Sequence, residues 1–96
     1  MKKLTISETG TSSTFRHRGG RNFFNIVGDF AGNTVTLEYS PDGDDWAACK
    51  DANGPVEFID DDGAWVELPN YSMRAVVTGG TAPTLDIYES DGYKAD

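Results

Sequence analysis

Cysteine and histidine are scarce in this chain of 96 residues, and their scarcity narrows the chemistry open to it. Cys49 is the only cysteine, which excludes an intrachain disulfide and the small secreted domains that several disulfides hold together. His17 is the only histidine. A Cys49–His17 nucleophile is disfavoured, because His17 stands among arginines and Cys49 alternates within an expected strand as a small core residue. We therefore expect no enzyme and no catalytic residues.

Long apolar runs are also missing. No stretch approaches the roughly 20 apolar residues that a membrane-spanning helix requires. The charged start, Met1 to Ile6, resembles the beginning of a secretory signal, but polar residues 7–13 follow where an apolar segment belongs. We expect neither a signal peptide nor a membrane partner.

Basic side chains are few, with eight lysines and arginines against sixteen acidic residues and a net charge of −8. Such a charge opposes binding to nucleic acid and to anionic lipid. Residues 1–21 hold five basic residues and one acidic residue, a balance of +4, so the other 75 residues sum to −12. This asymmetry predicts either a basic arm that contacts a neighbouring protein or ordinary solvated charge.

Helix signals are nearly absent, because eleven glycines and four prolines interrupt every window in which a helical apolar period could develop. Alternating segments predict strands instead, at residues 3–8, 22–27, 34–39, 46–50, 56–58, 64–68, 71–78 and 84–89. Short strands at this spacing, with no crossover helices, favour an all-β fold, an antiparallel β-sandwich of about 7–9 strands with an immunoglobulin-like arrangement. Residues 1–21 are expected as a basic arm or edge segment, 22–89 as the sandwich core and 90–96 as a short tail.

Three residues are expected to have structural roles. Gly43 ends the tight turn Ser40–Gly43 in the left-handed conformation, and Trp46 fixes this turn to the core. Tyr71 stands where immunoglobulin-like sandwiches have a tyrosine whose hydroxyl bonds back to the preceding turn, although a plain core tyrosine is the equal alternative.

The dense apolar run 23–27 is typical of a strand that is covered on both faces.

Two acidic turns, residues 42–45 and 60–62, raise the question of a calcium site. The acids do not alternate through a twelve-residue loop as a helical-hand calcium site requires. We expect solvated carboxylates, no metal and no cofactor, with an ion held between two loops as the weaker alternative.

Trp65 is expected to point outward, because Val66 and Leu68 define the inner face of its strand. An outward tryptophan on an acidic protein fits a protein interface at least as well as a sugar. With it, Phe15, Arg16, Arg18 and Arg21 are the expected partner contacts, the arginines on carboxylates and the phenylalanine in an apolar groove.

The segments Gly28–Gly43 and Leu68–Leu85 resemble small virion proteins of tailed bacteriophages, among them immunoglobulin-like sandwiches displayed on capsids or tails. The resemblance spans about residues 22–89, and in its first half it rests on a glycine, a strand, the Ser-Pro-Asp-Gly turn and Trp46. In the second it rests on Leu-Pro, Arg-Ala-Val and Gly-Gly-Thr-Ala-Pro.

This resemblance implies a structural virion protein, in particular an outer capsid decoration or cement protein that binds the shell through its basic N-terminal segment and loops. Its expected partners are the major capsid protein or other virion proteins and further copies of itself, as a dimer or trimer, assembled in the host cytoplasm. The alternatives are a tail or neck component, or a carbohydrate-binding module on the virion in which Trp65, Tyr88 and the loop aspartates contact a host-surface glycan.

Overall fold

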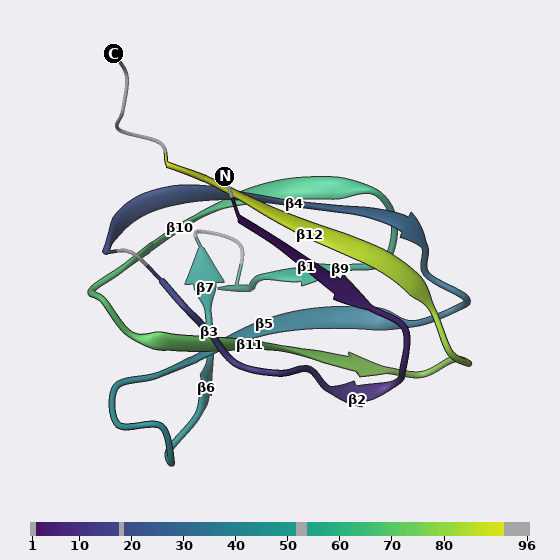
Figure 1. The fold of residues 1–96 in the computed structure, drawn as a ribbon, viewed down its shortest axis with the longest axis horizontal. Coiled ribbons are helices and arrows are strands. Elements are labelled where there is room, and N and C mark those ends of the chain that lie inside the picture. The colour runs from purple at the N-terminus through teal and green to yellow at the C-terminus, as the bar shows by residue number, and fades with distance from the viewer. Residues whose placement is uncertain (1, 18, 52–53, 92–96) are drawn as a thin grey trace.

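The computed structural model describes residues 2–17, 19–51 and 54–91, and no helix occurs within these ranges. Two antiparallel sheets pack face to face as a sandwich (Figure 1). The all-β antiparallel sandwich expected from the sequence is therefore confirmed. The strands are β1 (Lys2–Ile6), β2 (Gly10–Thr11), β3 (Phe15–Arg16), β4 (Gly20–Asp29), β5 (Thr34–Ser40), β6 (Ala47–Ala48), β7 (Lys50–Asp51), β8 (Gly54–Pro55), β9 (Glu57–Phe58), β10 (Asp62–Leu68), β11 (Ser72–Thr78) and β12 (Thr84–Asp91).

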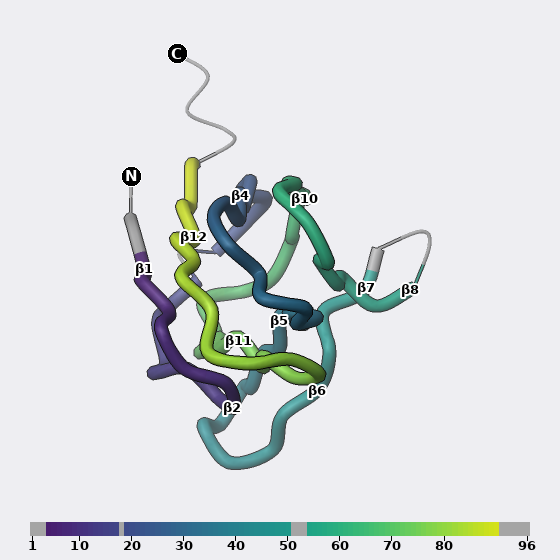
Figure 2. The backbone as a smooth tube through the Cα atoms, turned by 90° about the vertical axis from the view of Figure 1, so that its right-hand side faces the viewer, coloured from purple at the N-terminus to yellow at the C-terminus, as the bar shows by residue number. Residues whose placement is uncertain are grey.

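The first sheet, sheet A, has the strand order β1-β12-β4-β10, and Figure 2 shows these four strands in that order from left to right. β4 is the longest strand and pairs antiparallel with both β12 and β10. Its even-numbered residues 22, 24 and 26 are buried, whereas its odd-numbered residues face away from the second sheet. The two outermost strands of sheet A are β1 and β10.

The second sheet, sheet B, has the order β2-β11-β5-β6, and β3 and β9 add short pairings to β11 and β5. The expected strand 46–50 is interrupted at Cys49, whose N–H donates to Leu37 O at 2.9 Å. Val56 N–H donates to Cys49 O at 2.8 Å. β6 and β9 therefore lie one after the other along β5, and the β7–β8 ribbon between them leaves the sheet.

The core lies between the sheets and consists of the alternate apolar residues of the long strands. Phe24, Ile26 and Leu85 come from sheet A, and Leu37 and Met73 from sheet B, each with at most 1% of its surface exposed. Burying one such side chain stabilises the fold by about 1.5–3 kcal/mol. Cys49 is 2% exposed and belongs to this core, as the alternation of its segment predicts.

Residues 2–16 form edge strands in both sheets, β1 in sheet A and β2 and β3 in sheet B. The crossing from sheet A to sheet B is held at Ser12, whose N–H donates to Ala75 O at 2.8 Å and whose Oγ accepts the Ala75 N–H at 2.9 Å. The chain returns to sheet A through His17, which is fully buried. Residues 92–96 of the expected tail lie outside the described residues.

Two expectations about burial are wrong. The run 23–27 is not covered on both faces, because Val27 is 38% exposed and Phe23 is half-buried on the outer face of sheet A. Trp46 does not join the core, because its ring lies beside the Arg74 guanidinium, whose Cζ is 4.2 Å from the ring centroid. Phe23 and Trp46 therefore pack against neighbouring surface side chains, Trp65 and Arg74 respectively, and not against the core.

Candidate protein-binding surface

The outer face of sheet A carries an aromatic cluster at the pairing of β4 with β10. The register places Trp65 opposite Phe23 and Glu67 opposite Arg21. Because side chains alternate between the two faces of a strand, the inward position of Val66 turns Trp65 outward. Trp65 is 41% exposed, which is unusual for so large an apolar side chain and agrees with the orientation expected from the sequence.

Arg21, Phe23, Gly63 and Trp65 form what we call the Arg21–Trp65 cluster. The Arg21 Cζ lies 4.1 Å from the Trp65 ring centroid, and the Phe23 ring packs against Trp65 at 4.9 Å with an interplanar angle of 60°. A cation over an exposed ring contributes about 0.5–1 kcal/mol, and a tilted aromatic pair about 0.5–1.5 kcal/mol. The cluster is therefore organised before any partner binds.

Gly63 makes room for this arrangement. A Cβ at Gly63 would lie 2.5 Å from Phe23 Cζ and 2.5 Å from Asn25 Oδ1. The Phe23 ring thus crosses the strand at the one position of β10 that has no side chain. The absence of a side chain at Gly63 leaves room for the Phe23 ring to pack tilted against Trp65.

Further exposed apolar residues lie near the start of β10. Val27 follows Phe23 on the outer face of β4, and Ile59, in the turn that leads into β10, is 75% exposed. This turn is tied to β4 because the Gly28 N–H donates to Asp61 Oδ1 at 3.0 Å. The exposed Asn25 lies between Phe23 and Val27 on the outer face of β4, so Val27 is separated from the cluster by one polar side chain.

The other expected contact residues are placed elsewhere. The Phe15 ring is half-buried and packs 6.2 Å from the Phe24 ring, so it serves the core of its own chain. Arg16 is exposed, and its Nη1 donates to Asn70 O at 3.4 Å. Arg18 lies outside the described residues. Of the five expected contacts, the structure brings Arg21 and Trp65 together.

A second tryptophan–arginine pair lies on sheet B. Arg74 covers Trp46 and also donates from Nε to Glu38 Oε1 at 2.7 Å, an ion pair with both side chains about a quarter exposed. Tyr71 stacks on Tyr39, with centroids 6.0 Å apart and planes 12° from parallel. The Tyr71 side chain is thus held by this ring contact, and among the described residues its hydroxyl has no hydrogen bond to the preceding turn.

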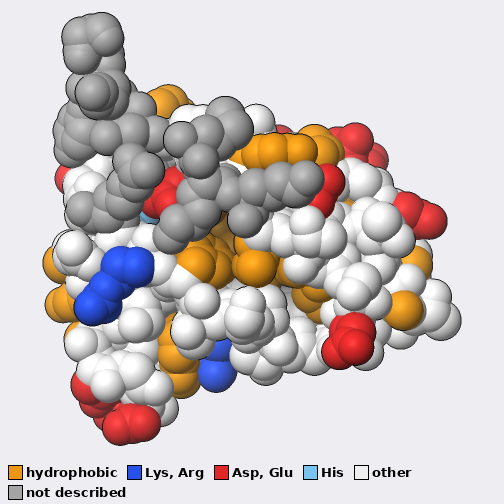
Figure 3. All heavy atoms as spheres, in the orientation of Figure 1, with side chains coloured by type: hydrophobic (Ala, Val, Ile, Leu, Met, Phe, Trp, Pro, Cys, Tyr) orange, Lys and Arg blue, Asp and Glu red, His pale blue; other side chains and the backbone are white. Residues whose placement is uncertain are grey.

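The turn after β5 is held by its own polar side chains. Asp42 Oδ1 accepts N–H bonds from Asp44 at 2.8 Å and Asp45 at 2.9 Å, and Ser40 Oγ accepts the Gly43 N–H at 2.7 Å. Gly43 has a φ of +85°, the left-handed conformation. The hydrogen bonds from Asp45, Asp44 and Ser40 lower the pKa of Asp42, and the Asp42 carboxylate in turn raises the pKa of Asp45. Acidic side chains gather where this loop projects at the lower left of Figure 3.

A buried polar group closes the end of the core where β3 leads into β4. His17 accepts the Gly19 N–H at Nδ1 (2.9 Å), and its Nε2 lies 3.1 Å from Val66 O, so the two ring nitrogens hold backbone groups of two different segments. Asn22 Nδ2 donates to Glu89 Oε2 at 3.0 Å, and both residues are buried. Sequence reasoning missed this group, since no local pattern links residues 17, 22 and 89.

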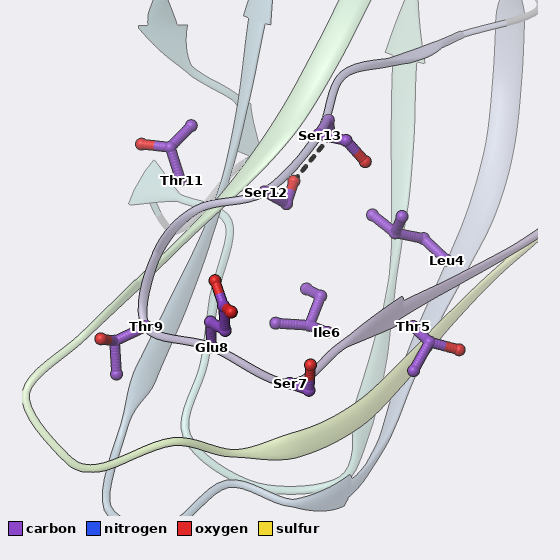
Figure 4. A pocket seen from close by; sticks show the side chains of 9 residues that line it. All are labelled: Leu4, Thr5, Ile6, Ser7, Glu8, Thr9, Thr11, Ser12 and Ser13. Atoms are coloured by element: carbon purple, nitrogen blue, oxygen red, sulfur yellow. Dashed lines mark hydrogen bonds between the residues drawn. The ribbon is translucent and has the colours of Figure 1, made fainter.

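Two hollows open on the surface of the described residues. The first, about 180 Å³, lies beside the β1–β2 crossing and is lined by Leu4, Ile6 and short polar side chains (Figure 4). The second, about 520 Å³, lies between the edges of the sheets and is lined by Tyr39, Cys49, Val66 and Leu68 among others. Burial raises the pKa of the Cys49 thiol to about 12, so it is not an activated nucleophile.

No group of three or more His, Cys, Asp or Glu side chains that could hold a metal ion occurs in the part of the chain that is described. Over the same residues, no helix is long and apolar enough to cross a membrane. Comparisons with protein-family models, with curated proteins and with solved structures found no match.

Proposed function

We propose that this protein is a structural protein that binds a larger protein assembly through the outer face of sheet A. The observation that carries the proposal is the Arg21–Trp65 cluster, an exposed and preformed arrangement of tryptophan, phenylalanine and arginine. Tryptophan and arginine are over-represented among the residues that dominate binding energy at protein interfaces. The acidic turn 60–62, which leads into β10, gives this apolar centre a polar border on one side.

The resemblance to small virion proteins of tailed bacteriophages supports a capsid shell as the assembly, with the protein as a decoration or cement subunit. A shell repeats one surface many times, so a modest contact at each copy suffices when copies also touch their neighbours. A tail or neck location and a role in carrying a glycan-binding site are the competing readings.

The geometry of Trp65 favours a protein partner over a sugar. A sugar ring stacks on an open aromatic face, but one face of Trp65 carries the Arg21 guanidinium and Phe23 packs tilted against the indole. A sugar would have to displace one of these side chains. An arginine held over a tryptophan can instead keep its outer N–H groups for a partner's carboxylates.

The test is co-sedimentation of the full chain with capsids that lack it. We expect saturable binding that Trp65→Ala and Arg21→Ala weaken about ten-fold or more, as truncation of a central interface residue does. Trp46→Ala is the matched control, because it removes the same side chain from beneath an arginine on the other sheet. Equal binding by the Trp65→Ala and Trp46→Ala variants, or no binding by the unaltered protein, would overturn the proposal. Binding of Trp65 to oligosaccharides in a glycan screen would move the assignment to the sugar-binding alternative.

A further inference from the structure

Sheet A ends in two edges that have no strand beyond them among the described residues, β1 on one side and β10 on the other. β10 is a regular strand of seven residues without proline. Lys50 of β7 lines one hollow together with Glu67 and Leu68, which places this strand of the β7–β8 ribbon beside the C-terminal end of β10. The N-terminal half of β10, from Asp62 to Trp65, is left as an open template for a further strand.

The two edges run in directions that suit each other. β1 and β4 point the same way, and β12 and β10 point the opposite way, because all three pairings between them are antiparallel. A second copy displaced sideways along the sheet therefore brings its β1 antiparallel to β10 of the first. The antiparallel alternation then continues without a break.

The rows of the sheet show which residues would meet. A row here is the set of residues that lie opposite one another across β1, β12, β4 and β10. One row is Leu4–Ile87–Ile26–Asp62, and the row two residues further along is Lys2–Glu89–Phe24–Ala64. Extending these rows into a neighbouring copy sets Lys2 opposite Ala64, Lys3 opposite Gly63 and Leu4 opposite Asp62. The two lysines then lie one or two residues along the strand from Asp62, the last residue of the acidic turn 60–62. Inner positions stay on the inner side and outer positions on the outer side, so no side chain changes its face.

The charges of the two edges are opposite. The start of β1 carries +2 from Lys2 and Lys3, and residues 60–62 carry −3. Like edges repel, β1 from β1 and β10 from β10, so two-fold pairing of identical edges is disfavoured. Opposite edges attract, which selects the head-to-tail contact.

We propose that copies of this chain associate head-to-tail, with β1 of one copy pairing antiparallel along β10 of the next so that sheet A continues from copy to copy. Such a contact is heterologous and leads to a ring or a short chain of copies. The inference does not rest on the proposed function. It adds to it, because a continuous sheet would present the Arg21–Trp65 clusters of successive copies on one side, where several weak contacts act together.

The first test is sedimentation velocity of the full chain from micromolar to millimolar concentration at low and high salt. We expect association that increases with concentration and weakens with salt. A single monomeric species throughout would overturn the proposal and would instead make Lys2 and Lys3 guards against edge pairing. Zero-length carbodiimide coupling of mixed ¹⁴N- and ¹⁵N-labelled protein should join Lys2 or Lys3 of one copy to residues 60–62 of another. Coupling between copies at Lys50 alone would contradict the assigned edges.

Charge variants separate this contact from a general charge effect. In the variant Lys2→Glu with Lys3→Glu, the start of β1 carries −2 and faces the unaltered acidic turn, which carries −3. In the variant Asp60→Lys with Asp62→Lys, the turn carries +1 and faces the unaltered start of β1, which carries +2. Each variant alone should therefore associate about ten-fold more weakly or worse. The two variants mixed should associate again, because β1 of the second (+2) meets the acidic turn of the first (−3).

Asp44→Lys with Asp45→Lys is the matched control for the acidic edge. It changes the net charge from −8 to −4, as Asp60→Lys with Asp62→Lys does, but in the loop after β5. This control should associate as the unaltered protein does or slightly better, because the repulsion between copies falls. Failure of the mixture to associate when each variant shows a cooperative thermal unfolding transition would refute the head-to-tail contact, as would equal loss of association in the control.

Discussion

Replacing Gly63 with alanine tests how the exposed cluster is built. The added Cβ would lie 2.5 Å from Phe23 Cζ and 2.7 Å from Phe23 Cε2, so the ring must leave its place beside Trp65. Losing the aromatic pair costs about 0.5–1.5 kcal/mol, and a strained Phe23 rotamer costs a similar amount. Alanine restores about 0.4–1 kcal/mol by narrowing the unfolded ensemble. We expect Gly63→Ala to lower the free energy of unfolding by about 1–2 kcal/mol, roughly 4–8 °C in Tm for each kcal/mol in a domain of this size.

The assay is urea unfolding of Gly63→Ala, Phe23→Ala and the double variant. If the Phe23 ring causes the cost, and Asn25 Oδ1, also 2.5 Å from the added Cβ, turns aside at the end of its flexible side chain, Gly63→Ala in the Phe23→Ala background should be neutral or stabilising. The sign of its effect on stability is then reversed. Gly80→Ala is the contrasting case, because its Cβ would overlap the Ala31 carbonyl oxygen and lie 2.8 Å from the backbone C of Gly32. Backbone atoms cannot move away as a side-chain ring can, so we expect Gly80→Ala to lower the free energy of unfolding by about 3 kcal/mol or more. The same loss for Gly63→Ala with and without Phe23 would refute the reasoning.

The remaining predictions concern the cluster, the buried thiol and the acidic turn. A double-mutant cycle of Arg21→Ala and Trp65→Ala in urea unfolding should give a coupling of about 0.5–1 kcal/mol, and a coupling of zero would show that the guanidinium does not stabilise the ring. Cys49 should resist thiol reagents until the protein unfolds. Burial raises the pKa of the folded Cys49 thiol from 9.0 to about 12, so the stabilisation from the neutral thiol should be fully present below pH 9. The free energy of unfolding should then fall by up to about 4 kcal/mol as the pH rises towards 12. Cys49→Ala should reduce this fall. Asp42 has a lowered pKa, so its contribution should be present above pH 3.8 and be lost as the pH falls below it. Asp42→Asn should flatten that acid dependence in urea midpoints, whereas an equal effect of Asp44→Asn would contradict the role given to the Asp42 carboxylate.

The sequence predicts the regular strands well, because their patterns are local. The alternation of residues 34–39 and the turn Ser40–Gly43 depend on neighbours along the chain, and β5 and its turn follow them closely. β2 and β3 were missed because they are two residues long and lie in a polar stretch. Their pairing depends on β11, some 60 residues away, through contacts such as Ser12 with Ala75. Distant partners of this kind leave no periodic signal.

The candidate surface was predicted only in part, for the same physical reason. The outward turn of Trp65 follows from the inner positions of Val66 and Leu68, which are local. The guanidinium over its ring follows from the register of β4 with β10, and Phe15 and Trp46 were misjudged because burial depends on what the opposite strand provides. The buried group of His17, Asn22 and Glu89 joins residues from three parts of the chain in the same way.

The central claim, that the outer face of sheet A binds a protein assembly, is tested most directly by oxidative footprinting of the two tryptophans in the unaltered protein. Trp65 and Trp46 each lie under an arginine and both are accessible in the free protein, so each serves as the reference for the other. On addition of capsids that lack the protein, the account predicts that oxidation of Trp65 falls strongly while that of Trp46 stays unchanged. Protection of Trp46 with Trp65 left reactive, or protection of neither when the protein co-sediments with the shell, would contradict it.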